Sequence, residues 1–460
     1  MNLPDDTIAA ISTPIGQGGI GIVRLSGPEA VAIAGKIFAP AGKRKLSSAR
    51  SFTVLYGRVV DPAGRQEIDE ALVTLMRGPR SYTREDVVEI NCHGGMVAVR
   101  RVLDTALSAG ARLAEPGEFT KRAFLNGRIS LAQAEAVMDL ISARTEESMR
   151  IAGEQLRGRL SGELGRLRES LVGLCANVEA HIDFPEEEIE PETIADIAVR
   201  IAAVKADLER LSKTFDEARF FREGLSVAIV GRPNVGKSSL LNALLKRDRA
   251  IVTEVPGTTR DTIEEYLNIE GLPVRIVDTA GIRHTDEAVE REGIRRSLDA
   301  LDAADYAVVV LDGSEPLREE DLELLKRVRE RTAVIAINKS DLKQRISREE
   351  PVFQGKDLIG ISAARGEGIE ELKSVLLQAN LRDWKEEREG PVVTNIRHKQ
   401  ALDKSAAALG RAAGVLASAG HLELLAIELR EAADSLGEIT GAITTDEILN
   451  RIFADFCIGK

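Results

Sequence analysis

Between residues 7 and 117 the hydrophobic positions form short runs separated by turn-forming residues. This pattern is typical of a sheet of short strands. Residues 97–109 instead repeat apolar side chains at helical spacing. A Gly-rich stretch at 16–21 precedes the first run, and we interpret it as a turn rather than a phosphate cradle. We therefore expect an α+β domain over 1–122, with strands at 20–25, 52–60, 70–76 and 86–91.

From residue 130 the hydrophobic positions follow a helical period as far as about residue 219. Ser130 and Gln133 have capping-box spacing, and Thr444 and Glu447 repeat that spacing before the last apolar helical face. An acidic run at 183–191 interrupts the helices; a solvated loop is the main interpretation, and docking to a basic partner is the alternative. We expect 123–219 and 385–460 to pack together as one all-α domain.

Strand-like and helix-like segments alternate from 225 to about 379, as in a doubly wound parallel sheet. The apolar run 225–230 is followed by residues 231–238 (GRPNVGKS), which fit the phosphate-binding pattern G-x-x-x-x-G-K-[ST]. The glycines let backbone N–H groups face a triphosphate, Lys237 reaches its outer phosphates, and the Ser238 hydroxyl is suited to Mg²⁺. We expect an α/β nucleotide domain over 220–384, inserted in the helical domain.

Four further motifs follow the phosphate-binding loop in order along the chain. They are 257–261 (GTTRD), with Thr259 as a second Mg²⁺ contact, 278–281 (DTAG), 338–341 (NKSD) and 362–364 (SAA). The Asp341 carboxylate is suited to accept hydrogen bonds from the N1–H and 2-amino groups of guanine, a donor pair that adenine lacks. The sequence therefore predicts GTP as the nucleotide.

One position departs from Ras-like switches. Ile282 stands where a glutamine would orient the attacking water, and the switch segments contain no obvious charge-stabilising arginine. Asn234 is a candidate ligand for a monovalent cation, and Glu290 is a candidate to act on water. From the residues alone, the favoured interpretation is that Glu290 is an ordinary exposed carboxylate.

The bulk composition limits the classes of binding partner that we expect for this protein. The net charge of −12 and the 3% aromatic content do not predict nucleic-acid binding, so an RNA partner would need a local basic patch or a second protein. The three cysteines form no C-x-x-C pair, which argues against a zinc site or a disulfide framework. No apolar run has the length of a membrane span, and we expect a cytoplasmic protein.

Residues outside the GTPase motifs carry a more specific signal. Over its whole length the chain resembles the MnmE (TrmE) family of bacterial tRNA-modification GTPases, through residues 93–95 (HGG), 116–119 (PGEF), 122–126 (RAFLN), 180–185 (AHIDFP) and 457–460 (CIGK). The resemblance implies an N-terminal tetrahydrofolate-binding and dimerisation domain, a helical domain and an inserted Ras-like GTPase domain. It also implies a homodimer that acts with the flavoprotein MnmG. Together they add an aminomethyl or carboxymethylaminomethyl group to C5 of the wobble uridine of certain tRNAs.

The same resemblance implies cofactors and site residues. The cofactors are GTP, Mg²⁺, K⁺ and 5-formyl- or methylene-tetrahydrofolate. K⁺ would be held by Asn234, Thr253, Val255 and Thr258, and Glu290 would be catalytic. The folate residues would be Arg24, Glu89, Arg128 and Lys460, although Arg128 replaces a family lysine, so its contact is the least secure. The GTP residues would be Asn234, Val235, Gly236, Lys237, Ser238, Ser239, Thr253, Glu254, Val255, Pro256, Gly257, Thr258, Thr259, Asp278, Thr279, Ala280, Gly281, Asn338, Lys339, Asp341, Ser362, Ala363 and Ala364.

Two functional hypotheses stay open at this point. The first is GTP hydrolysis coupled to tRNA modification; the alternative is a GTP-dependent switch or ribosome-assembly factor with no role of its own in modification. The segments that flank the GTPase motifs favour the first, because they are acidic or mixed in charge and poor in aromatic residues. Cys457 is assigned no reaction, since the sequence places no base beside it.

Overall fold

The computed structural model describes residues 6–62, 66–183, 193–248, 265–277, 301–381, 384, 390–418 and 421–460. The chain forms two compact units, which we treat separately. The first comprises residues 1–138, 156–169 and 433–460, and the second comprises 139–155 and 170–432. None of the helices in these described ranges combines the length and the apolarity that a membrane crossing requires.

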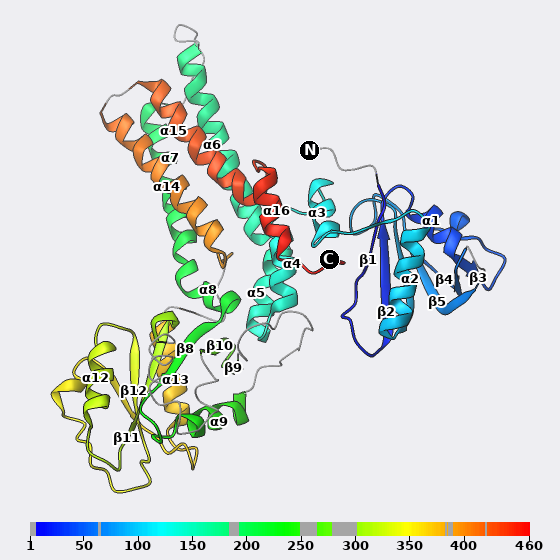
Figure 1. The fold of residues 1–460 in the computed structure, drawn as a ribbon. Helices are drawn as coiled ribbons and strands as arrows, with labels where there is room; N and C mark the ends of the chain where they lie inside the picture. Colours follow the sequence, from blue (N-terminus) through cyan, green and yellow to red (C-terminus); the bar gives the residue numbers. More distant parts are fainter. Residues whose placement is uncertain are drawn as a thin grey trace. The chain divides into compact units, whose positions relative to one another are not determined.

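The first unit contains a seven-stranded sheet of order β3-β4-β5-β6-β2-β1-β7, antiparallel except for the β1–β7 pair. Two helices, α1 (Ala30–Ile37) and α2 (Met96–Ser108), pack their apolar faces on one side of it (Figure 1). The predicted strands and the helix at 97–109 are confirmed to within about three residues. The strands are β1 (Ile8–Ile11), β2 (Gly18–Ser26), β3 (Phe38–Pro40), β4 (Thr53–Val60), β5 (Glu67–Met76), β6 (Val87–Gly94) and β7 (Arg112–Leu113).

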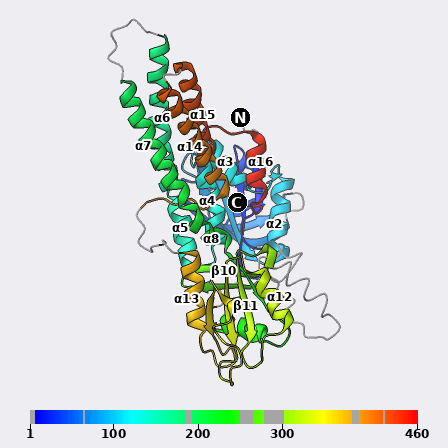
Figure 2. The same cartoon turned by 90° about the vertical axis from the view of Figure 1, so that its left-hand side faces the viewer.

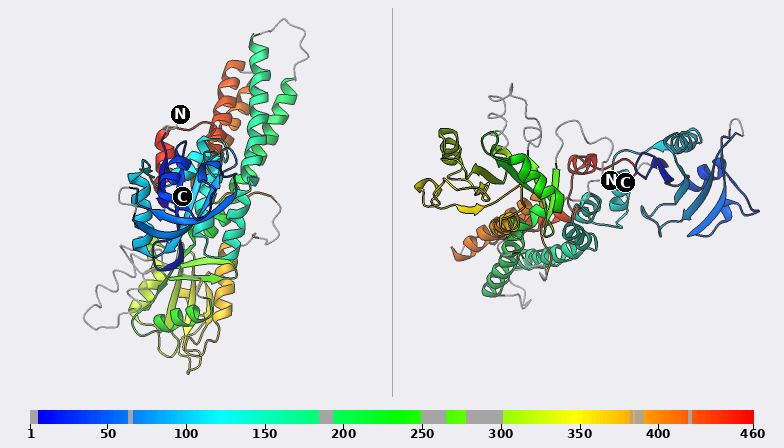
Figure 3. Two further views of the ribbon diagram at one scale, coloured as in Figure 1. Left: turned by 90° about the vertical axis from the view of Figure 1, so that its right-hand side faces the viewer. Right: turned by 90° about the horizontal axis from the view of Figure 1, so that it is seen from below.

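The same unit holds the C-terminal helix against the segment that follows the sheet. Helix α16 (Asp446–Ala454) packs Leu449 and Phe453 on Leu131 of α4 (Leu131–Ser142), while α3 (Glu118–Leu125) contributes Phe124. Figure 3 shows α16 next to α3. The predicted cap at Ser130 is confirmed, because its N–H donates to Gln133 Oε1 (2.9 Å) and its Oγ accepts from Gln133 N (3.2 Å).

The second predicted capping box is wrong by one residue. Thr445, not Thr444, is the N-cap of α16, and its hydroxyl accepts from Ile448 N at 3.4 Å. Either of two adjacent threonines can serve as an N-cap, and the capping-box spacing to Glu447 singles out Thr444. The register of the apolar face on α4 instead makes Thr445 the cap.

The second unit contains a six-stranded sheet of order β13-β12-β11-β8-β10-β9, parallel except for β9. Every residue of the three central strands β8, β11 and β12 is buried, as expected for a parallel sheet covered by helices on both faces. The elements are β8 (Leu225–Val230), α9 (Lys237–Asp248), β9 (Glu265–Ile269), β10 (Leu272–Val277), β11 (Tyr306–Asp312), α12 (Glu319–Arg327), β12 (Ala333–Asn338), β13 (Asp357–Gly360) and α13 (Ile369–Asn380).

Helices before and after this sheet lie side by side, so the α/β domain is inserted between them (Figures 1 and 2). Helix α7 packs along α14, and Ser212 on α7 donates to Asp403 on α14 at 2.5 Å. Ser405 on α14 donates to the Ala432 carbonyl on the next helix at 2.9 Å. These helices are α5 (Glu146–Leu156), α6 (Arg159–Asp183), α7 (Ile194–Lys213), α8 (Phe215–Glu223), α14 (Ile396–Ala417) and α15 (Leu422–Thr440).

Candidate functional site

The phosphate loop, residues 231–238, connects β8 to α9 at the carboxyl edge of the parallel sheet. Two of its glycines are required by space. A Cβ at Gly231 would approach Val310 O to 2.4 Å, and one at Gly236, whose φ is +103°, would approach Asn338 Nδ2 to 2.1 Å. The loop therefore curls tightly in front of the first turn of α9, which is the arrangement that directs backbone N–H groups at phosphate oxygens.

Lys237 lies across this loop. Its ammonium donates to the carbonyl oxygens of Gly231 (2.7 Å) and Arg232 (2.9 Å), and burial lowers its pKa. These two carbonyl contacts hold the cation on the inner side of the loop, where a triphosphate of opposite charge would compete for it. Ser238 follows at the first turn of α9 and is half-buried.

Asn338, at the end of β12, joins the phosphate loop to the loop predicted to cap the base. Its amide nitrogen donates to the Val235 carbonyl at 2.7 Å, and its amide oxygen accepts from Ala363 N at 3.0 Å. Asn338 is 3% exposed, so both amide groups need these partners. The structure thus brings Val235, Asn338 and Ala363 together, although 128 residues separate the first from the last.

The carboxylate of Asp341 lies beside Ser362, whose hydroxyl donates to it at 2.8 Å. That hydrogen bond, together with the charge of Arg365, lowers the pKa of Asp341. Lys339, with φ +63°, pairs with Asp312 Oδ2 at 2.6 Å, so the base-binding motif is anchored to β11. Asp341 is therefore ionised at neutral pH and able to accept from two N–H donors at once.

An interaction of the phosphate loop that the sequence did not reveal involves Arg232. Its guanidinium pairs with Glu315 (2.7 Å) and with the buried Asp321 (3.2 Å) at the start of α12. Because these two carboxylates already pair with it, the Arg232 guanidinium is not available to bind phosphates. No pattern in the sequence marks this, because both partners lie more than 80 residues away.

Many predicted nucleotide and cation residues lie outside the described residues. These are Thr253, Glu254, Val255, Pro256, Gly257, Thr258, Thr259, Asp278, Thr279, Ala280, Gly281 and Glu290. Of the predicted residues that are described, Ser239 and Ala364 are exposed at the rims of the two loops. Asn234 is also exposed, with φ +64°, and in the described chain its side chain makes no hydrogen bond.

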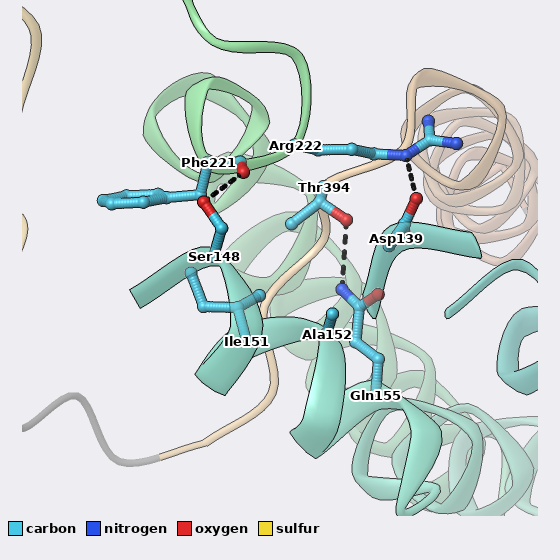
Figure 4. A pocket seen from close by; sticks show the side chains of 8 residues that line it. All are labelled: Asp139, Ser148, Ile151, Ala152, Gln155, Phe221, Arg222 and Thr394. Carbon is cyan, nitrogen blue, oxygen red and sulfur yellow. Dashed lines mark hydrogen bonds and ion pairs between the residues drawn. The ribbon is translucent and has the colours of Figure 1, made fainter. Parts of the chain in front are cut away.

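Figure 4 shows where the chain enters and leaves the α/β domain. On α5, Ser148 donates to the Phe221 carbonyl (2.6 Å), and Gln155 donates to the Val392 carbonyl and to Thr394 Oγ1 (both 3.1 Å). Arg222 also pairs with Asp139 at 2.7 Å. One helix thus holds both connections of the inserted domain.

A second group of predicted residues lies on the N-terminal sheet. Arg24 on β2 pairs with Glu89 on β6 at 2.8 Å, and their side chains are 18% and 21% exposed. The guanidinium lies 5.7 Å from the ring centre of Tyr82 and 5.6 Å from that of Phe119. Both contacts of this pair use Glu89 Oε1, and within the described chain Oε2 has no hydrogen-bond partner. The second carboxylate oxygen of Glu89 is therefore available to an N–H donor.

The last four residues complete this site from the far end of the chain. Gly459 O accepts from Arg24 Nη1 (3.4 Å) and from Ser12 Oγ (3.1 Å), and Ile458 forms a bridge with Pro116. A Cβ at Gly459, whose φ is +95°, would approach Ile11 O to 2.1 Å, so only glycine fits this position. Lys460 directly follows Gly459, and helix α16 before it packs against α3.

Arg128 lies near the same aromatic ring. Its guanidinium is 4.7 Å from the Tyr82 ring centre and exposed. In the described residues neither Arg128 nor Lys460 has a carboxylate within ion-pair distance. The two cations and the Arg24–Glu89 pair therefore form one neighbourhood with unsatisfied positive charge. The Cys457 thiol is exposed and free, and no reaction is assigned to it.

A buried ion cluster supports this neighbourhood. Arg122 on α3 is fully buried, and its guanidinium contacts Asp6 (2.6 Å), Glu85 (3.1 Å) and Glu118 (3.0 Å). Arg112 also pairs with Asp6 and Glu118, both at 2.6 Å. The cluster fixes α3 on the sheet, and Phe119 of α3 is one of the two rings beside Arg24.

The charge state of this cluster makes helix α3 sensitive to acid. Burial alone would raise the pKa of Asp6 and Glu118, but hydrogen bonds from Arg112 and Arg122 outweigh it and hold both below their ordinary 3.8 and 4.5. A depressed carboxyl pKa stabilises the fold above the unfolded-state pKa and ceases to do so as pH falls through the folded-state pKa. Amide protection of α3, corrected for intrinsic exchange, should hold from pH 7 to about 5 and decline below about pH 4.5.

Hydrogen exchange of the full chain, followed by mass spectrometry, measures this. Helix α2 serves as the control, because it packs on the same sheet. The one carboxylate of α2, Asp104, is exposed and forms no ion pair in the described chain. A parallel decline of α2 and α3 would mean that the whole domain unfolds, and would contradict a local role for the cluster.

Comparison with known proteins relates both sites to one family. The models of the TrmE N-terminus and the MnmE helical domain match residues 7–128 and 131–457. The tRNA modification GTPase MnmE of Carboxydothermus hydrogenoformans is 48% identical over 459 residues, 99% of this chain and 100% of the relative. That of Geobacter metallireducens is 48% identical over 460 residues, 99% of both chains. Among solved structures, the G domain of the T. maritima FeoB iron transporter covers 34% of this chain and 98% of its own, at 28% identity and TM-score 0.25. The chain has an α+β N-terminal domain, an all-α domain and an α/β Ras-like GTPase domain, and it belongs to the MnmE family of tRNA modification GTPases.

Proposed function

We propose that the protein is a K⁺-activated GTPase that acts with the flavoprotein MnmG on the wobble uridine of certain tRNAs. The product is an aminomethyl or carboxymethylaminomethyl group at C5, and the one-carbon donor is formyl- or methylene-tetrahydrofolate. One observation carries the proposal: the same chain contains two candidate sites. The first is the phosphate loop, which a hydrogen bond joins to Asn338. The second is the Arg24–Glu89 pair, which Gly459 contacts from the C-terminus. The whole-length identity to proteins named for tRNA modification supports the choice of substrate.

In this proposal the domains are 1–122 for folate binding and dimerisation, 123–219 with 385–460 for the helical domain, and 220–384 for the GTPase. The protein acts as a cytoplasmic homodimer. Asp341 selects guanine, and Lys237 offsets phosphate charge. Ser238 and Thr259 would hold Mg²⁺, which would offset the negative charge of the phosphates. The half-buried Ser238 at the first turn of α9 is compatible with that role.

The described residues also fit K⁺ and folate. The exposed amide of Asn234 has no partner in the described chain, as a ligand awaiting a cation requires; Thr253, Val255 and Thr258 complete the proposed set. K⁺ supplies positive charge beside the phosphates, a role that Arg232 cannot take because Glu315 and Asp321 hold it. For folate, Glu89 Oε2 accepts from the pterin edge, while Arg24, Arg128 and Lys460 face its anionic groups.

Cation dependence tests the role of Asn234. We expect GTP hydrolysis in K⁺ to exceed that in Na⁺ by roughly tenfold or more, since the smaller ion fits a K⁺-sized set of ligands poorly. Asn234→Ala should lower the rate in K⁺ to the rate in Na⁺. Steady-state phosphate release in either salt measures this. Equal rates in the two salts, or an unaffected variant, would exclude the cation role.

Glu290→Ala tests the proposed catalytic carboxylate. Turnover should fall by about 10²-fold or more, because orientation of water is lost, while affinity for GTP stays near that of the unmodified protein. Single-turnover hydrolysis and nucleotide titration separate the two quantities. A variant that loses affinity together with turnover would show a structural role instead.

The tRNA role is tested in cells that lack the gene. We expect C5 of the wobble uridine to be unmodified in those cells and modified again when the gene is returned, as read by mass spectrometry of tRNA nucleosides. Fully modified tRNA in the deletion strain would overturn the proposal and favour a GTP-dependent switch. Co-purification with MnmG tests the partner separately.

A further inference from the structure

Six exposed cations gather on two loops of the N-terminal domain. We call them the basic patch: Lys43, Arg44 and Lys45 with Arg50 on the loop between β3 and β4, and Arg80 with Arg84 on the loop between β5 and β6. The chain as a whole has a net charge of −12. A concentration of six positive charges therefore runs against the overall balance and needs an explanation of its own.

Hydrogen bonds hold the two loops together. The Arg77 guanidinium, on the second loop, donates to the Ser47 carbonyl on the first at 2.9 Å, and Arg77 N donates to Ser51 Oγ at 2.9 Å. At its other end the second loop is fixed to the turn after α3. There Arg84 donates to the Asn126 carbonyl (2.8 Å), and Asn126 donates to the Thr83 carbonyl (2.7 Å). The two loops that carry the patch are thus fixed to each other and to the turn after α3.

Carboxylates next to the patch are already engaged. Asp86 pairs with Arg77 at 3.1 Å and accepts from Gly78 N at 3.0 Å, and Glu85 pairs with the buried Arg122 at 3.1 Å. In the described part of the chain none of the six cations has a carboxylate within ion-pair distance. Elsewhere exposed arginines have such partners, as Arg411 has in Glu428 and Glu431. The patch therefore keeps positive charge available for a ligand.

The chemistry of the patch favours a phosphate backbone. Four of its six residues are arginines, whose planar guanidinium groups match phosphate oxygens in pairs. Phe52, which follows Arg50 at the start of β4, is 65% exposed, so an aromatic face suited to base stacking lies next to the charges. Exposed phosphates with unstacked bases are the combination that RNA loops present.

The patch also borders the proposed folate site. Tyr82 belongs to the same loop as Arg80 and Arg84, and its ring contacts both Arg24 and Arg128, at 5.7 and 4.7 Å. An RNA strand held by the patch would therefore pass beside the Arg24–Glu89 pair. We propose that the basic patch binds the phosphate backbone of the tRNA and presents its anticodon loop to the Arg24–Tyr82 neighbourhood. This inference rests on the proposed tRNA-modifying function and assigns it a location.

Salt dependence of RNA binding tests the patch directly. The probe is an unmodified tRNA transcript with uridine at the wobble position, titrated with the full chain at several salt concentrations. Each lost phosphate contact lowers the slope of log K against log salt by about 1. Arg44→Gln/Arg80→Gln should therefore reduce the slope by about 1–2 and weaken binding roughly tenfold at physiological salt.

Two matched variants serve as controls. Arg100→Gln/Arg101→Gln removes two exposed arginines from α2 in the same domain and should leave the slope unchanged. Arg44→Lys/Arg80→Lys keeps the charge and should keep most of the slope, a rescue that a merely structural defect would not show. GTP hydrolysis by all three variants should equal that of the unmodified protein.

The proposal would be overturned if Arg44→Gln/Arg80→Gln left the slope and the affinity for RNA unchanged. If the variant instead lost an acidic protein partner while RNA binding stayed intact, the surface would be assigned to that partner. The outcome is separable from that for the proposed function. If deletion strains keep modified tRNA while the slope still falls in the variant, the modification role fails and the patch stands. If the deletion strain lacks the modification and the variant restores it with an unchanged slope, the patch fails and the function stands.

Discussion

Asp341→Asn should weaken GTP binding by a hundredfold or more and create affinity for xanthosine triphosphate. The Asp341 carboxylate, held ionised beside Ser362 and Arg365, offers two acceptors to the N1–H and 2-amino groups of guanine. An amide keeps one acceptor and places a donor against the 2-amino group, so a charged hydrogen bond is lost and an unfavourable donor pair is created. Xanthine has an oxygen at that position and accepts from the amide.

Titration of the full chain with both nucleotides measures the exchange of specificity. A carboxylate that served only to accept the Ser362 hydroxyl would give a different result. Both nucleotides would then weaken by the same factor in the variant. That outcome would remove Asp341 from the base site and leave it as a residue that stabilises the loop.

Arg122→Met should destabilise the N-terminal domain by about 3–5 kcal/mol, the cost of leaving buried carboxylates without their partner. Arg122 is fully buried and is the residue shared by Asp6, Glu85 and Glu118. Methionine fills much of the same volume but has no donor. Because Arg112 also pairs with Asp6 and Glu118, these two carboxylates keep one cationic partner in the variant. Glu85 should therefore lose the most stabilisation.

The matched control is Arg58→Met on β4 of the same unit. Arg58 pairs with Glu67 at 2.9 Å, but both side chains are about half exposed, and we expect a loss below about 1 kcal/mol. Local opening of α3 by hydrogen exchange compares the two variants without requiring the multidomain chain to unfold in one step. Similar small losses in both would mean that the Arg122 cluster contributes no more than a surface pair.

Local sequence predicts the elements whose signals lie within about ten residues. The run 225–230 followed by GRPNVGKS predicts a strand, a loop and a helix, and these are β8, the phosphate loop and α9. The Ser130–Gln133 cap belongs to the same class. In each case the hydrogen bonds or apolar contacts connect residues near in sequence, so spacing alone identifies them.

Features that depend on distant partners were not predictable. Nothing near Arg122 indicates that it is buried, because Asp6 and Glu85 come from other elements. The ion pair between Arg232 and Asp321 on α12 could not be predicted for the same reason. Helices α1 and α3 and the short strands β1, β3 and β7 were also missed. Two or three residues carry too little periodicity to be recognised, and β7 exists only because it pairs with β1.

The contact between Arg24 and Gly459 has a consequence for how the protein is made. The two residues are 435 positions apart, and ribosomes add about 5–20 residues per second, so Arg24 emerges roughly 20–90 s before its partner. Throughout that interval the N-terminal sheet lacks the segment that covers Ile11 and Ser12. The neighbourhood of Arg24 and Tyr82 is therefore assembled only in nearly complete chains, and prematurely terminated chains would carry it open.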